Sequence, residues 1–164
     1  MGNIIVQLAE PHWTRHTLHL ASALARNTQS SITLLHLMVV RHPGLLGSDI
    51  AASPPTMEAH TQFEDYAFIC EDYGVPCVLQ SIQYISFIEA LQDAASILNA
   101  NVLFAKKPQS PVKIWNTLQT WWLTRCIQST GCKLYLIDGS TNMLDWIPEH
   151  LVEDVRQPVN HIPG

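Results

Sequence analysis

The sequence predicts an α/β fold of Rossmann-like type: a five-stranded, mostly parallel sheet in the order 3-2-1-4-5, with helices on both faces. Short apolar runs alternate along the chain with segments of helical periodicity, which is typical of sheets built from β-α-β units. The run at 32–40 is almost continuously apolar, as in a parallel strand that is covered on both faces. Right-handed crossover connections lead from this element order to the predicted strand order.

The periodicity predicts nine elements. The expected strands are residues 3–8, 30–40, 75–85, 101–105 and 133–138. The expected helices are residues 12–27, 57–73, 86–99 and 110 to about 130. Residues 41–56 are rich in Pro, Gly and Ser and are expected to form a loop. Ser110 suits the cap of the fourth helix, and Pro111 suits its first turn.

Local patterns support the predicted helices. Trp13, Thr17 and Ala21 recur on one face of the first helix, so we expect that face to cover the sheet. Gly74 and Gly131 follow the second and fourth helices, where glycine commonly ends a helix in the left-handed conformation.

Composition indicates one compact domain and excludes several classes of function. The 164 residues are 47% apolar and 14% charged, which argues against disorder. The net charge of −5, with nine lysines and arginines, argues against nucleic-acid binding. The chain has neither a signal-peptide pattern nor an apolar run long enough for a membrane span, so we expect a cytoplasmic protein with no membrane contact. No Cys-x-x-Cys pair occurs, so the four cysteines are expected to be reduced thiols and no metal site is predicted.

We expect the α/β domain to span residues 1–138 and residues 139–164 to form a C-terminal tail. The tail contains a predicted short helix at 148–155 and several apolar residues, among them Trp146 and Leu151. Apolar side chains in a terminal segment usually dock against another surface, so the tail is expected to pack on the domain or on a dimer partner.

The order of elements resembles that of the universal stress protein family. The segments that carry the resemblance are residues 4–8, 18–26, 31–37, 73–77, 88–98, 101–104 and 132–137. Together they span about residues 3–138, and the element lengths match together with the strand segment Leu34–Leu37, which reads Leu-Leu-His-Leu. The resemblance implies a stress-related protein that forms a homodimer through its last strand.

The sequence departs from the pattern of the family's nucleotide-binding members. Those members carry an Asp at the end of strand 1, where this chain has Ala9, and a glycine-rich motif after strand 4. Residues 105–115 contain no glycine here, and Pro108 and Pro111 have no N–H to offer a phosphate. The resemblance therefore implies a divergent member that lacks the ATP-binding motif, with no cofactor and no catalytic residues to carry over.

A ligand crevice is expected where the strand order reverses, between strands 1 and 4. The candidate ligand-binding residues there are Ala9, Glu10, Arg41, Lys106, Lys107, Ser110 and Lys113. Lysines near a helix N-terminus can hold an anion, but the same residues also form an ordinary solvated loop. Both interpretations stay open at this stage.

Two helix faces offer further candidates. His12, His16 and His19 share one face of the first helix, where they either bind a metal or form a surface stripe of neutral side chains. The fourth helix carries three of the five tryptophans, which either form an interaction surface or pack inside a helix that is buried all round. The candidate interaction residues are Trp115, Trp121, Trp122 and, in the tail, Trp146.

Common enzyme motifs are absent from the sequence, so we expect a protein that is not an enzyme. The leading hypothesis is a non-catalytic, stress-related interaction or regulatory domain that does not bind ATP and that acts as a homodimer with a protein partner. The alternative is a small-ligand sensor that binds a nucleotide or another anion at the crevice between strands 1 and 4.

Overall fold

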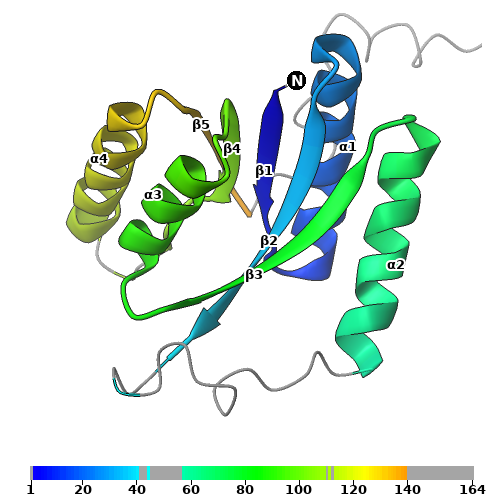
Figure 1. The fold of residues 1–164 in the computed structure, drawn as a ribbon. Coiled ribbons are helices and arrows are strands. Elements are labelled where there is room, and N and C mark those ends of the chain that lie inside the picture. The colour runs from blue at the N-terminus through cyan, green and yellow to red at the C-terminus, as the bar shows by residue number, and fades with distance from the viewer. Residues whose placement is uncertain (1, 41–43, 45–56, 110, 112, 140–164) are drawn as a thin grey trace, which may run out of the picture.

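The computed structural model describes residues 2–40, 44, 57–109, 111 and 113–139, and its elements follow the predicted order. The strands are β1 (Asn3–Gln7), β2 (Ser31–Val39), β3 (Cys77–Tyr84), β4 (Val102–Lys106) and β5 (Lys133–Ile137). The helices are α1 (Pro11–Thr28), α2 (Met57–Asp72), α3 (Phe87–Ile97) and α4 (Lys113–Ser129). Figure 1 shows their arrangement.

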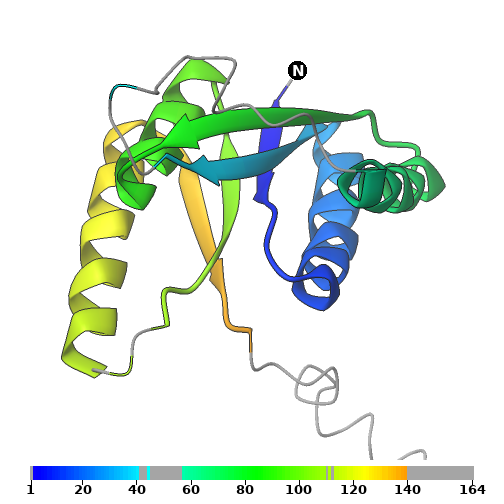
Figure 2. The ribbon, with the colours of Figure 1, turned by 90° about the horizontal axis from the view of Figure 1, so that it is seen from below.

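The five strands form one parallel sheet in the order β3-β2-β1-β4-β5, which confirms the predicted fold class and strand order. β1 is the central strand, and its Ile4 lies opposite Ile32 of β2 and Val102 of β4. Helices α1 and α2 cover one face of the sheet, and α3 and α4 cover the other (Figures 1 and 2).

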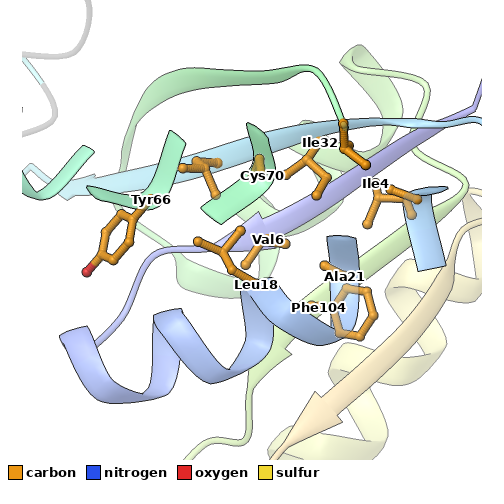
Figure 3. Close-up of a cluster of buried hydrophobic side chains, with 11 residues drawn as sticks. Ile4, Val6, Leu18, Ala21, Ile32, Tyr66, Cys70 and Phe104 are labelled. Carbon is orange, nitrogen blue, oxygen red and sulfur yellow. The ribbon is translucent and has the colours of Figure 1, made fainter. Parts of the chain in front are cut away.

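Each face of the sheet carries its own hydrophobic core. On the α1 and α2 side, Ile4 and Val6 of β1 pack with Leu18 of α1 (Figure 3). On the other side, Ile5 packs with Leu123 of α4 and with residues of α3 and β4. Side chains alternate between the faces along a strand, so a central strand covered on both faces has a continuous apolar sequence.

Some element boundaries differ from the prediction. β3 begins at Cys77 and not at residue 75, because the N–H of Val75 donates to the carbonyl of Cys70 (3.0 Å) and completes the end of α2. The placement of Pro111 in the first turn of α4 was wrong, since Pro111 lies in a bend and the helix begins at Lys113. The helix begins further along the chain than predicted because the N–H of Lys107 still donates to the carbonyl of Ile137 in β5 (3.1 Å).

The helix ends are partly as expected. Gly74 and Gly131 follow α2 and α4 with positive φ angles of 68° and 77°, as predicted. Gln29 and Asn99 take the same left-handed conformation after α1 and α3, at φ 51° and 48°. Neither was expected, because neither is the glycine that normally marks this position.

Two predicted segments lie outside the described residues: nearly all of the loop at 41–56, and residues 140–164, which include the expected short helix at 148–155. Among the helices that the structure describes, none combines the length and the hydropathy needed to cross a bilayer.

Candidate functional site at the ends of β1 and β4

The strand order reverses at β1, which has β2 on one side and β4 on the other. In open parallel sheets, ligands bind outside the carboxyl ends of the strands at such a reversal. Ala9 and Glu10 follow the end of β1, while Lys106 and Lys107 stand at the end of β4. These four predicted residues therefore lie at the edge where a ligand is expected.

Lys106 and Glu10 form an ion pair at this edge. Lys106 Nζ donates to Glu10 Oε1 at 2.5 Å, with 21% of the lysine side chain and 63% of the glutamate side chain exposed. The hydrogen bond from Lys106 is the main reason why the pKa of the Glu10 carboxyl lies below its ordinary value. The charge of Lys106 is thus already paired within the chain.

The backbone donors after β4 are also engaged. The N–H of Lys106 donates to Oε1 of Gln7 at 3.0 Å, and the N–H of Lys107 donates to the carbonyl of Ile137 at 3.1 Å. Pro108 has no N–H at all. None of the three successive residues 106–108 therefore has a free backbone N–H to donate to a phosphate.

Gln7 was not recognised from the sequence as part of this site. It is buried at the end of β1, with 8% of its surface exposed. A polar side chain inside an apolar strand needs a hydrogen-bond partner, and that requirement is the signal that could have identified it.

Two pockets border the β4–α4 connection. The first, of about 440 Å³, is lined by side chains that include Gln7, Lys106, Lys107 and Gln109. The second, of about 490 Å³, runs along α4 and is lined by residues that include Lys107, Lys113 and Trp121. Lys107 borders both pockets, whereas Lys113 borders only the second, so the structure does not bring all the predicted lysines into one site.

The other predicted ligand residues are placed differently. The N–H of Ala9 donates to Thr14 Oγ1 at 3.1 Å, and Ala9 lines a separate pocket of about 320 Å³ on the α2 side of the sheet. Arg41 and Ser110 lie outside the described residues.

That separate pocket was not predicted from the sequence, because its lining comes from β2, β3, α2 and the end of β1. It contains His36 and Ser81, whose side chains approach to 3.5 Å, and Tyr66. Burial raises the pKa of the Tyr66 hydroxyl, which therefore stays neutral.

The histidine stripe lies on α1 as expected. His12 and His19 are exposed and His16 is half-buried, and Nδ1 of His19 lies 3.3 Å from the Tyr73 hydroxyl. Within residues 2–40, 57–109 and 113–139, no three His, Cys, Asp or Glu side chains gather closely enough to hold a metal ion.

Helix α4 presents apolar side chains to solvent. Its fully buried residues are Leu123 and Ile127, which face the sheet. The exposed set, which we name the α4 aromatic face, consists of Ile114, Trp115, Leu118, Trp121 and Trp122. Each of its three tryptophans is more than half exposed, at 56%, 54% and 52% in chain order. Among the residues that the structure describes, α4 is therefore not buried all round, and Trp146 lies outside those residues.

No protein-family model matches the chain, and no curated protein matches it. Solved structures do resemble it. The hypothetical protein MJ0577 aligns with a TM-score of 0.61 at 13% identity, over 86% of this chain and 98% of that one. The universal stress protein UspA from Lactobacillus plantarum gives 0.57 at 16% identity, over 83% and 97% of the two chains.

A universal stress protein family protein from Arabidopsis thaliana, with AMP bound, gives a TM-score of 0.52 at 14% identity, over 88% of this chain and 95% of that chain. Sequence identities this low establish similarity of fold. The chain therefore has the five-stranded, Rossmann-like α/β fold of universal stress protein structures.

Proposed function

We propose that this chain is a non-catalytic, stress-related interaction domain of universal stress protein type, and that the edge between β1 and β4 does not bind ATP. The observation that carries the proposal is that the polar groups at the carboxyl ends of β1 and β4 already bind other groups of the same chain. The Lys106 ammonium is paired with Glu10, and the N–H groups of Lys106 and Lys107 are both engaged within the sheet. A triphosphate would have to displace these contacts and would meet the Glu10 carboxylate.

The α4 aromatic face supports the interaction role. Exposed apolar patches of this kind mark sites of association, and Trp and Arg are favoured at the centres of interfaces. Arg125 lies over the Trp121 ring at 5.7 Å, which adds a cation to the patch. We further propose that the protein is cytoplasmic and that two copies pair through β5, whose Tyr135 is 47% exposed at the edge of the sheet.

One observation favours the alternative of an anion sensor. Lys107 is exposed and borders both pockets at the β4–α4 connection, so one cation remains open to a ligand there. In that case Lys107 and the start of α4 would bind an anion without a glycine-rich loop.

Calorimetric titration separates the two functions. The full chain, purified without nucleotide, is titrated with ATP and with AMP in the presence of magnesium, since AMP is bound in the Arabidopsis thaliana structure. The proposal predicts no saturable heat at millimolar ligand. Saturable binding that Lys107→Ala abolishes, and that Lys133→Ala at the amino end of β5 preserves, would establish the sensor instead.

A further inference from the structure

The α4 aromatic face has no cover among the residues that the structure describes, although its side chains are large. The Trp121 and Trp122 rings lie 6.4 Å apart, and Ile114 at the start of the helix is 80% exposed. Aromatic side chains supply much of the binding energy of an interface, so this face is costly to leave in water.

The chain leaves the sheet beside the β4–α4 connection. A Cβ on Gly139 would lie 3.0 Å from Cε of Lys106, and Nε2 of Gln109 donates to Asp138 Oδ1 at 3.4 Å. The end of β5 is therefore held against the β4–α4 connection. From there the pocket lined by Lys107, Lys113 and Trp121 continues along α4.

The following residues are long enough to reach the face. Residues 140–145 span up to about 20 Å when extended. Helix α4 has 17 residues and is about 25 Å long. Residues 140–145 together with a segment that begins at residue 145 are therefore long enough to pass the β4–α4 connection and continue along α4.

The charges of the two parts are complementary. Helix α4 carries two cations, Lys113 and Arg125, and no acidic residue. Residues 140–164 carry four acidic residues and one arginine, and the acidic residues alternate with apolar ones between positions 145 and 155. These apolar residues are Trp146, Ile147, Leu151, Val152 and Val155.

We infer that residues 145–155 dock on the α4 aromatic face of the same chain. Their apolar side chains cover the indoles, and their carboxylates lie toward Lys107, Lys113 and Arg125. The docked segment therefore occupies the surface that a separate partner would also use. The inference rests on the part of the proposed function in which α4 is an interaction surface. It identifies residues 145–155 as the segment that covers this surface.

Hydroxyl-radical footprinting of the full chain, read by mass spectrometry at each tryptophan, tests the inference. In the variant Ile147→Asp/Leu151→Asp, modification of Trp115, Trp121 and Trp122 should rise at least about threefold, because each indole becomes half-exposed. Trp13, which is 5% exposed, reports on the fold and should not change. The matched control Val159→Asp/Ile162→Asp adds the same two negative charges outside the docking segment and should have no effect.

A reciprocal variant guards against an indirect effect of the tail substitutions. Arg125→Glu reverses a charge on the exposed side of α4 and should raise modification of Trp146. Rates that stay unchanged in either variant would overturn the inference. Protection of the α4 tryptophans that is lost on dilution, and that the tail substitutions leave intact, would assign the face to a second copy and would also overturn it.

These outcomes are separate from the failure of the proposed function. Unchanged footprints would remove the docked segment while leaving α4 available to a separate partner. Failure of the nucleotide part of the proposed function would instead appear as saturable ATP binding, which footprinting of α4 does not measure.

Discussion

Lys106 Nζ and Glu10 Oε1, from residues 96 positions apart in sequence, lie 2.5 Å from each other at the carboxyl ends of β4 and β1. This contact joins the two strands between which the sheet reverses its order. The ion pair also neutralises Lys106, one of the lysines that the sequence suggests as an anion-binding group at that point. The same ion pair leaves a carboxylate where a phosphate would have to bind.

The variant Lys106→Met should raise the pKa of Glu10 toward its ordinary value of 4.5, because the hydrogen bond that stabilises the carboxylate is lost. Titration of the Glu10 side-chain carboxyl by ¹³C NMR measures this change. Lys107→Met removes a neighbouring lysine that is not part of the Lys106–Glu10 ion pair and serves as the control. An unchanged Glu10 titration in Lys106→Met would contradict the ion pair.

The sign of the pH effect follows from the direction of the shift. The folded pKa of Glu10 lies below the unfolded value, so the pair stabilises the fold above about pH 4.5 and its contribution is lost as the pH falls. The contribution is small and sensitive to salt, since Glu10 is largely exposed.

Leu123 and Leu118 provide a matched test of which side of α4 faces the sheet. Leu123 is fully buried, so Leu123→Ala should lower the free energy of unfolding by about 2–5 kcal/mol. Leu118 is 50% exposed, so Leu118→Ala should cost less than Leu123→Ala even with residues 145–155 docked on the α4 aromatic face. Urea denaturation of both variants gives the comparison, and equal losses would mean that α4 is rotated or covered differently.

Cys132 should make stability fall at alkaline pH. It is a free, buried thiol, and burial raises its pKa from 9.0 to about 11. The unfolded chain therefore loses this proton first, and the free energy of unfolding decreases between about pH 9 and pH 11, by at most about 3 kcal/mol. Cys132→Ala should reduce this decrease, with the difference at pH 7 serving as the correction for lost packing. Parallel pH curves for the two proteins would contradict the prediction.

Gln29 ends α1 in the left-handed conformation. This conformation has a higher free energy for a residue with a Cβ atom than for glycine. Gln29→Gly should therefore raise the free energy of unfolding, measured by urea denaturation, by up to about 1 kcal/mol. Gln119→Gly places the same change in the middle of α4 and should lower the free energy of unfolding by about 1 kcal/mol. A loss of stability in both variants would show that Gln29 is not strained.

The order and direction of the strands could be predicted because they depend on patterns local to each element. Residues 32–35 of β2 are fully buried, which is why the run from 32 reads as almost continuously apolar. Helix boundaries are harder to predict where no glycine follows the helix, as at Gln29. The start of α4 is hard to predict because Lys107, in the β4–α4 connection, is hydrogen-bonded to β5. That hydrogen bond joins residues 30 positions apart, so no local pattern contains it.

The candidate site was predicted in its location but not in its contacts. Lys106 and Glu10 each appeared in the sequence as a potential ligand group, and periodicity does not show that they bind each other. The α4 aromatic face shows the same limit. Sequence spacing groups Trp115 and Trp122 on one stripe, but only the packing of Leu123 and Ile127 against the sheet turns that stripe outward.

The most direct test of a nucleotide-free edge is a site-resolved titration. ¹⁵N–¹H NMR spectra of the full chain are recorded while magnesium-ATP is added to millimolar concentration, and the amides of Lys106, Lys107 and Glu10 are followed. We predict that these resonances keep their positions, because the N–H groups of Lys106 and Lys107 are hydrogen-bonded within the sheet and the charges of Lys106 and Glu10 are paired with each other. Saturable shifts centred on Lys106 and Lys107 would contradict the account and would mean that ATP displaces the Glu10 ion pair.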